Sequence, residues 1–276
     1  MKNALHSLSY ALISHRHLSG FLSRQPDGDI SKLATRRADA DGEDDEDQPW
    51  WKTEDWWGDP LPTPEMAGST AVIPIKGLIS SGYPTMFRAF GYADTDQIAG
   101  WVRAAAQDDN VQKIVLSIDS PGGMVTGTPE LAEEVYNASL VKPVLAHSKG
   151  MMDSAAYWVG SQADAVYCTP SADIGCIGVY QVHYDYTGWL KNMGIRAEMF
   201  RSGDLKGAGH PDVPMTDDQR AHLQSEIETI GAQFQAAVKL KRTLVEDDSM
   251  QGQSFIGTEA AARNLVADLL PLEALL

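Results

Sequence analysis

From Ser69 onward, short apolar runs rich in β-branched residues alternate with helical patterns. The runs 71–79 and 113–119 have the composition of strands covered on both faces. Further runs of this kind lie at 141–147, 165–169, 177–180 and 197–200. Helical patterns lie at 94–108, 128–139 and 154–163, and a long one begins at Met215. This alternation predicts an α/β fold with a largely parallel sheet flanked by helices.

Two of the predicted helices carry start signals. Thr128 is expected as an N-cap, followed by Pro129, whose missing N–H does no harm at the first helical position. Thr216 is expected to cap the long helix. One face of that helix is apolar and predicts burial, its residues being Leu223, Ile227, Ile230, Phe234 and Val238.

Residues 1–68 differ from the remainder of the chain. They hold an acidic block, the Trp pairs 50–51 and 56–57, and three prolines between Pro60 and Pro64. Like charges keep such a segment extended, and the prolines stiffen it. We therefore expect a flexible acidic, Trp- and Pro-rich N-terminal arm over 1–68 and a folded domain over 69–276. The tryptophans either dock back onto that domain or bind a partner.

Composition excludes several kinds of protein. The net charge of −16 argues against nucleic-acid binding, which needs a basic surface. The two cysteines, Cys168 and Cys176, are too few for a disulfide framework and lack partners for a zinc site. We expect neither metal nor cofactor. No apolar stretch approaches the roughly 20 residues that span a bilayer, and no secretory signal is evident. We expect a cytoplasmic protein without a membrane segment.

Two loops follow predicted strands, where functional groups gather in α/β sheets. In "DSPGGMVTG", Gly122 and Gly123 allow the backbone N–H groups to stabilise an oxyanion, although a simple Pro-Gly turn fits equally well. In "KGMMDSAAYWVGSQAD", Ser154 precedes a helix, and the Ala155 N–H lies at its positive end. Ser154 is either a helix cap or a nucleophile. Its surroundings are not the Gly-x-Ser-x-Gly elbow.

Four segments together carry a family resemblance: "IDSPGG", "MMDSAAYWVGSQADAVY", "IGCIGVY" and "FRSGDLKGAGHP". In order and spacing they resemble the signal peptide peptidase A family of serine proteases, and in particular its phage capsid (head maturation) protease branch. The resemblance spans about 71–270. It implies a ClpP/crotonase-like fold and peptide hydrolysis by a Ser–Lys dyad. By motif, Ser154 is the nucleophile, Lys206 the general base, and Gly123, Gly122 and Ala155 the oxyanion-hole residues.

A lysine base sets a physical requirement. An exposed lysine has a pKa near ~10.4, and lowering it to about 7–8 takes roughly 3 units, on the order of 4 kcal/mol. Burial supplies this because it disfavours the ammonium. We therefore expect Lys206 in an apolar pocket, away from Asp204. A histidine base, His147 or His210, is the rival assignment.

Neighbouring residues have expected supporting roles. Asp119 and Ser120 orient the glycine loop, and Tyr157 and Trp158 pack. The family's "Gly-Ser-Ile-Gly" element has Cys176 at the serine position here. Asn264 replaces a family glycine near the end of the chain, which leaves the geometry of that turn open.

The resemblance implies a serine endopeptidase acting on extended or unfolded protein segments, in capsid and scaffold maturation. The alternatives are signal-peptide or general peptide clearance, and a structural capsid component with a vestigial site. An acyl-CoA enzyme on the same fold is more remote. Relatives assemble, and in some the serine and lysine come from neighbouring subunits. We expect a homo-oligomer with sites near subunit interfaces, located in the host cytoplasm or phage prohead.

Overall fold

A computed structural model describes residues 11–13, 61–82 and 85–276. Its larger sheet has the order β11-β10-β8-β6-β3-β2, and β9 and β12 extend it beside β8. The pairs β3–β6, β6–β8, β8–β9, β8–β10 and β9–β12 are parallel, whereas β2 and β11 pair antiparallel at the two edges. The bounds are β2 (Glu65–Ala67), β3 (Thr70–Lys76), β6 (Lys113–Ser120), β8 (Val144–Asp153), β9 (Ala165–Cys168), β10 (Asp173–Gly175), β11 (Ser254–Ile256) and β12 (Asp268–Leu269).

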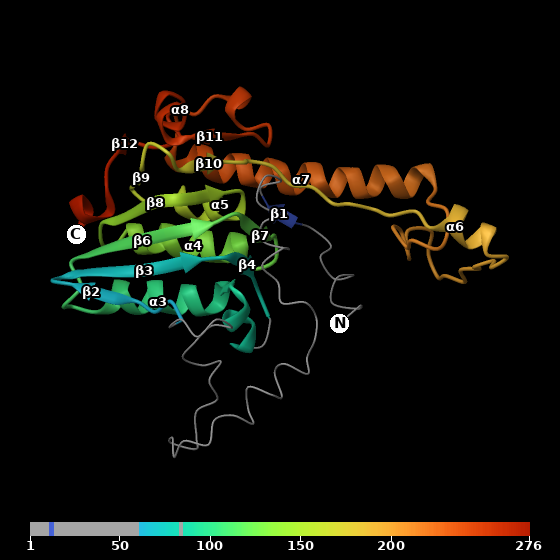
Figure 1. Ribbon diagram of the computed structural model, residues 1–276, viewed down its shortest axis with the longest axis horizontal. Helices are drawn as coiled ribbons and strands as arrows, with labels where there is room; N and C mark the ends of the chain where they lie inside the picture. The colour runs from blue at the N-terminus through green and yellow to red at the C-terminus, as the bar shows by residue number, and fades with distance from the viewer. Residues whose placement is uncertain (1–10, 14–60, 83–84) are drawn as a thin grey trace, which may run out of the picture.

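Helices cover this sheet (Figure 1). Helix α3 contacts α4, α4 contacts α5, and α7 lies against α5. Their bounds are α3 (Thr95–Gln107), α4 (Thr128–Ser139), α5 (Ala155–Gly160), α6 (Thr187–Asn192), α7 (Asp217–Lys241) and α8 (Gly257–Ala262), with short 3-10 turns η3 (Thr85–Phe90), η4 (Asp247–Ser249) and η5 (Leu272–Leu275). The predicted α/β fold, a largely parallel sheet flanked by helices, is confirmed.

A smaller sheet has the order β1-β7-β4-β5. Its strands are β1 (Ala11–Ile13), β4 (Leu78–Ser80), β5 (Tyr92–Asp94) and β7 (Gly122–Met124). The run predicted as one strand over 71–79 divides at Gly77, where φ is +86° and a Cβ would lie 2.0 Å from the Gly91 oxygen. The chain crosses from the larger sheet into the smaller one there because only glycine fits.

The core lies where the central strands meet the helices. Ile73, Ile114 and Leu116 are completely buried. The Trp158 ring stacks on Phe234 with centroids 4.6 Å apart, and the Tyr157 hydroxyl donates to the Leu265 carbonyl at 2.8 Å. These contacts place Tyr157 and Trp158 in the packing role that the sequence predicted.

The folded part begins before residue 69. Leu61 is buried, β2 pairs with β3 within 65–67, and Arg88 donates to the Pro62 carbonyl. The end of the predicted arm is therefore an edge of the sheet. Both Trp pairs of the arm lie outside the described residues.

Several predicted details differ from the structure. Strand β8 continues to Asp153, beyond the predicted end at residue 147. The predicted strands 177–180 and 197–200 do not form; Tyr180 makes an isolated bridge and Phe200 is 92% exposed. A short apolar run becomes a strand only when a neighbouring strand accepts its hydrogen bonds, and composition does not reveal that neighbour.

Of the two predicted helix N-caps, one is confirmed and one is wrong. Thr216 and Gln219 form a reciprocal capping box at the start of α7, as expected of Thr216. Helix α4 is instead capped by Gly127 at φ +84°, while the Thr128 hydroxyl donates to the Met124 carbonyl at 2.7 Å. Thr128 is thus the first residue of the helix, and the preceding turn needs the glycine.

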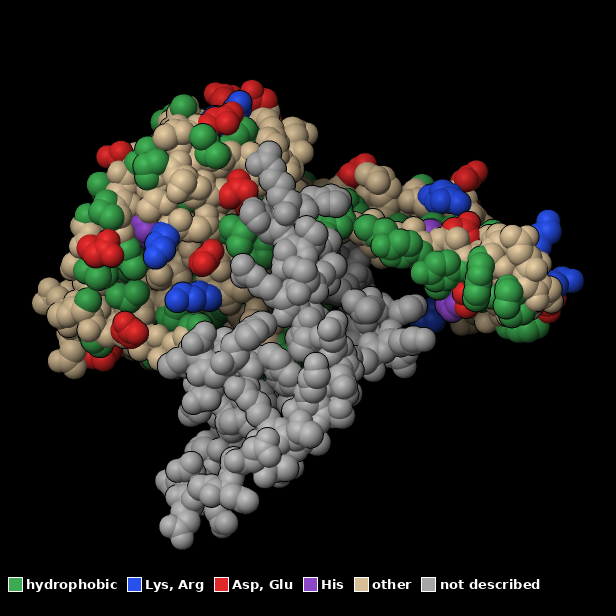
Figure 2. Space-filling view, in the orientation of Figure 1, with side chains coloured by type: hydrophobic (Ala, Val, Ile, Leu, Met, Phe, Trp, Pro, Cys, Tyr) green, Lys and Arg blue, Asp and Glu red, His purple; other side chains and the backbone are tan. Residues whose placement is uncertain are grey.

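Residues 181–216 and the N-terminal half of α7 form a projecting region, here called the extension (Figure 1). On α7, Phe234 and Val238 are buried, but Leu223, Ile227 and Ile230 are only half-buried. Large apolar side chains are exposed along the extension (Figure 2), namely Val182, Tyr184, Tyr186, Trp189, Met193, Ile195, Phe200 and Leu205. The predicted apolar face of the long helix is therefore covered only at its C-terminal end.

Candidate active site

Ser154 lies between the last residue of β8 and the first residue of α5. Its backbone has φ +55° and ψ −121°, a conformation that residues with a Cβ rarely adopt and that costs about 1–3 kcal/mol. Its N–H donates to the Gly175 carbonyl at 2.7 Å, which holds the junction against the end of β10. The surrounding strands thus maintain a strained turn at this serine.

The Ser154 side chain is not a helix cap. It makes no capping hydrogen bond, and its hydroxyl oxygen is buried without a partner among the described residues. Leaving a buried hydroxyl unpaired costs about 1–3 kcal/mol. A serine that caps a helix satisfies its hydroxyl, so this arrangement disfavours the cap and leaves the oxygen available for another interaction.

The glycine loop approaches the same helix. Strand β7 contacts α5, and Ser120, at the end of β6, pairs with Met152 two residues before Ser154. Gly122 has φ +99°, and its N–H donates to the Ser120 hydroxyl at 3.1 Å. A Cβ on Gly123 would lie 1.9 Å from the Ile79 oxygen. Both glycines are needed by the backbone, and the Gly122 N–H is already engaged, which favours Gly123 as the donor.

Ser120 contacts the glycine loop as the sequence predicted, whereas the Asp119 side chain supports β8 instead. The Asp119 carboxylate accepts the Met151 N–H at 3.1 Å, where the pairing of β6 and β8 shifts register. A Cβ on Gly150 would lie 2.4 Å from that carboxylate. The carboxylate thus fixes the final residues of β8 that lead into Ser154.

Two further contacts at this junction were not predicted. The Ser254 hydroxyl donates to Asp153 at 3.0 Å, and Cys176 has φ +51° with its N–H on the Gln253 carbonyl at 2.8 Å. Sequence offered a signal only for Cys176, at a family serine position. Asn264, at the family glycine position, has φ +61°, a conformation that asparagine tolerates better than most residues.

Lys206 does not lie in an apolar pocket within this chain. It is exposed, in the loop between α6 and α7. The Gln219 side chain ties this loop to the start of α7 by donating to the Asp204 carbonyl at 2.8 Å. Phe234, which contacts α5 through Trp158, is 15 residues further along α7, or roughly 22 Å at 1.5 Å per residue. The structure therefore brings Ser154, Ala155 and the glycine loop together, but places Lys206 of the same chain elsewhere.

Neither rival histidine is placed as a base for Ser154. The His147 ring is buried, and its Nε2 lies 2.9 Å from the Leu270 carbonyl, to which it donates. It precedes Ser154 by seven residues, roughly 20 Å along an extended strand. His210 is exposed, and its Nδ1 accepts the Asp212 N–H at 3.3 Å. A Ser–His–Asp arrangement around Ser154 is not formed by these residues.

A cavity of about 620 Å³ borders this region. It lies between residues 176–180 and α7, with Tyr180, Ile227 and Gln235 in its wall. Cys176, also in the wall, directly follows Gly175, whose carbonyl holds the Ser154 N–H. This chain of contacts links the cavity to the serine junction.

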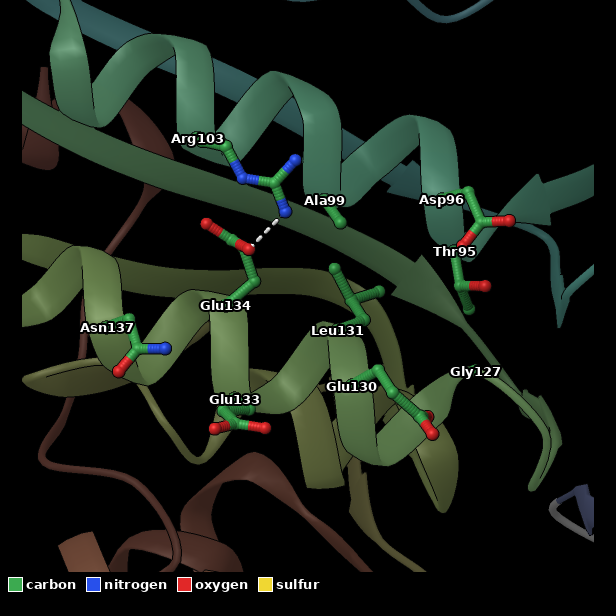
Figure 3. A pocket seen from close by; sticks show the side chains of 10 residues that line it. All are labelled: Thr95, Asp96, Ala99, Arg103, Gly127, Glu130, Leu131, Glu133, Glu134 and Asn137. Carbon is green, nitrogen blue, oxygen red and sulfur yellow. Dashed lines mark hydrogen bonds and ion pairs between the residues drawn. The ribbon is translucent and has the colours of Figure 1, made fainter.

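A different hollow lies between α3 and α4 (Figure 3). Asp96 and Glu130 occupy the first turns of these helices, where negative charge is favourable, and Arg103 pairs with Glu134. Favourable first-turn charges and one ion pair account for Asp96, Glu130, Arg103 and Glu134, so we do not assign a site there.

Neither metal ligands nor a membrane helix is apparent. Across residues 11–13, 61–82 and 85–276, no three His, Cys, Asp or Glu side chains are grouped to hold a metal ion. None of the helices described is long and apolar enough to cross a membrane. Cys168 is buried, and burial raises its pKa to about 11.

Comparison with known proteins identifies relatives of this chain. Capsid assembly protease C of Escherichia phage lambda is 31% identical over 170 residues, which are 62% of this chain and 39% of that protein. The head-tail preconnector protein GP5 of Enterobacteria phage P21 is 29% identical over 191 residues, 69% of this chain and 37% of that protein. The chain spans about half, or less, of the length of the curated relatives it matches.

A solved structure of the ClpP protease catalytic domain from Plasmodium falciparum aligns with a TM-score of 0.40 and 12% identity, covering 73% of this chain and 86% of that one. A score of this size adds nothing to the sheet order given above. The model of peptidase family S49 matches residues 137–275, half of the chain, and includes both Ser154 and Lys206. The chain therefore belongs to peptidase family S49, the signal peptide peptidase A family that its motifs predicted.

Proposed function

We propose that this chain is a serine endopeptidase with Ser154 as its nucleophile. The observation that carries the proposal is the Ser154 junction: a strained backbone presents a buried hydroxyl that has no partner among the described residues. Strain of this kind persists where the surrounding structure maintains it, and it concentrates at active sites. Membership of a peptidase family supports peptide-bond hydrolysis as the reaction in which such a hydroxyl would take part.

In the proposed reaction, the Ser154 oxygen attacks the peptide carbonyl carbon while a neutral Lys206 amine accepts the hydroxyl proton. The N–H groups of Gly123 and Ala155 stabilise the resulting oxyanion. The C–N bond then breaks, and Lys206 returns the proton to the leaving amine. Water activated by Lys206 attacks the acyl ester, which releases the second product and restores the Ser154 hydroxyl.

We propose further that Lys206 acts on the Ser154 of a neighbouring copy. Within its own chain it is exposed, in the loop between α6 and α7, at the opposite end of α7 from the part that contacts α5. It lies on the extension, whose apolar side chains are left exposed by the described residues of this chain. Docking of the extension on another copy would bury those side chains and remove water from Lys206, and desolvation is what a lysine base requires.

For substrates, we propose extended or unfolded protein segments, and capsid and scaffold proteins as the biological targets. The support is the similarity to a phage capsid assembly protease and a head-tail preconnector protein. Signal-peptide or general peptide clearance remains the alternative within the family. The alternative from another class of protein is a structural capsid component with a vestigial site. The strained Ser154 backbone and its hydroxyl, unpaired among the described residues, disfavour this alternative, because backbone strain that serves no function only lowers stability.

The test is intact mass over time for the wild type, Ser154→Ala and Lys206→Ala, each incubated with unfolded casein. We expect cleavage by the wild type alone. Ser161→Ala, at another buried serine seven residues beyond Ser154, is the matched control and should retain activity. Equal behaviour of wild type and Ser154→Ala would refute the nucleophile and favour the structural role.

A further inference from the structure

The backbone of residues 11–13 forms a strand on the glycine loop. Strand β1 pairs antiparallel with β7, with Ala11 opposite Met124, Leu12 opposite Gly123 and Ile13 opposite Gly122. These three residues come from the predicted arm, and they lie beside β7 in Figure 1. A segment more than 100 residues away in sequence therefore covers the two proposed oxyanion glycines.

Strand β7 offers an incoming strand only one edge. Its other edge faces β4, where Gly123 pairs with Ile79. A Cβ on Gly123 would lie only 1.9 Å from the Ile79 oxygen, so the two backbones are in close contact there. An extended peptide that adds to β7 must use the edge that β1 now covers.

That edge is also where a substrate has to bind. Strand β7 contacts α5, the helix that begins directly after Ser154. A scissile carbonyl whose oxygen accepts a hydrogen bond from the Gly123 N–H must run beside Gly123. Addition of an extended peptide to an exposed strand edge is a common mode of peptide recognition. Leu12 stands opposite Gly123, so substrate and arm compete for the same backbone groups.

We propose that residues 11–13 are an internal competitor that occupies the substrate strand position on β7. Peptide substrate and the arm are mutually exclusive there, and the enzyme is fully open only when β1 has left. Three residues make a short strand, but tethering raises their effective concentration to about the millimolar range. The inference rests on the proposed peptidase function.

The variant that tests the proposal is Leu12→Pro/Ile13→Pro in the full chain. Successive N–H groups of a strand point in opposite directions, so one of two adjacent prolines must remove a donor that faces β7. The pair therefore disrupts β1 in either hydrogen-bonding register. Leu33→Pro/Ala34→Pro, elsewhere in the predicted arm, is the matched control.

The first readout is binding, measured in the Ser154→Ala background so that no catalysis is needed. The probe is a fluorescent peptide of residues 7–16, SLSYALISHR. We expect it to bind the Leu12→Pro/Ile13→Pro protein roughly tenfold or more tightly than either the unmodified or the control protein, because a tethered competitor is lost. The same peptide carrying both prolines should not bind. Equal affinity for all proteins, or binding to none, overturns the proposal.

The second readout is amide hydrogen exchange at Gly122–Met124, which should speed up in the Leu12→Pro/Ile13→Pro protein and not in the control. Unchanged exchange means that β1 does not cover β7 in solution. The two hypotheses fail separately. If none of the proteins hydrolyses substrate but the difference in peptide binding remains, the proposed peptidase function is wrong and the competitor proposal stands. If the unmodified protein and the Leu12→Pro/Ile13→Pro protein hydrolyse substrate at the same rate, the peptidase function stands and the competitor proposal is wrong.

Discussion

Large apolar side chains are buried in the sheet-and-helix body and exposed in the extension. In the body, Ile73, Ile114 and Phe234 are completely buried by other parts of the same chain. In the extension, Trp189 is 60% exposed and Phe200 is 92% exposed. The body is a finished folding unit, whereas the extension carries large apolar surface that no described part of this chain covers.

This difference matters because the proposed dyad is divided between the two regions. Ser154 belongs to the body, and Lys206 belongs to the extension. Large exposed apolar patches mark interaction surfaces in proteins that remain in solution. A second copy that covers the extension would complete the surface and the site together, so assembly and activity should be lost by the same changes.

The largest expected effect comes from mixing two inactive variants. Ser154→Ala and Lys206→Ala should each lose roughly 10³-fold or more of the activity alone. If Ser154 of one copy meets Lys206 of the next, co-expression should restore about a quarter of the wild-type rate, because random assembly joins the intact halves at about one site in four. The measurement is casein cleavage by the co-purified mixture.

The control for this mixture is a doubly substituted chain, Ser154→Ala/Lys206→Ala, co-expressed with either single variant, which cannot form an intact pair. No recovery from the first mixture, with both variants still assembling, would mean that Ser154 and Lys206 do not come from different copies. The body and the extension would then have to meet within one chain.

Truncating one phenylalanine in each region tests the comparison directly. Phe234→Ala should lower the free energy of unfolding by about 3–5 kcal/mol, because it opens a cavity against Trp158. Phe200→Ala should change it by less than about 0.5 kcal/mol, as expected for an exposed side chain, yet weaken assembly. Chemical unfolding and sedimentation velocity give the two readings. Stability loss from Phe200→Ala without loss of assembly would contradict the division.

The same division explains what the sequence did and did not predict. Strand β6 was predicted within one residue because both of its faces are covered by its own chain, which makes the run continuously apolar. Residues 197–200 were also predicted as a strand, but no described part of this chain covers Phe200, and they form no strand. A hydrophobic pattern in the sequence indicates that a residue is suited to burial, but it does not identify the residues that bury it.

The site followed the same rule. Local motif was enough to place Ser154, Ala155 and the glycine pair together, because β6, β8 and α5 position them. Lys206 is exposed and not in the predicted apolar pocket, and under the proposed docking a second copy would supply that pocket. The pairing of residues 11–13 with β7 was not predicted, since three residues carry no periodic signal and their partner is remote in sequence.

A smaller effect should reveal strain at the serine junction. Ser154→Gly and Ser154→Ala both remove the hydroxyl, but only glycine adopts φ +55° and ψ −121° without cost. The glycine variant should therefore be more stable than the alanine variant by about 1 kcal/mol. Urea unfolding of the two variants measures the difference. As a control, Ser161→Gly, in an ordinary right-handed conformation, should be less stable than Ser161→Ala.

The smallest expected effect is a pH dependence in the body. Burial lowers the pKa of His147, although the hydrogen bond to the Leu270 carbonyl and the Glu273 carboxylate act in the opposite direction. A histidine whose pKa is lower in the folded protein stabilises it above its unfolded pKa of about 6.5. That contribution declines as the pH falls through the lowered folded value.

His147→Gln keeps an N–H donor for Leu270 but cannot titrate, so its free energy of unfolding should fall less steeply than that of the wild type between neutral and acidic pH. A slope in His147→Gln as steep as that of the wild type, or steeper, would show that the acid sensitivity does not arise from burial of this histidine.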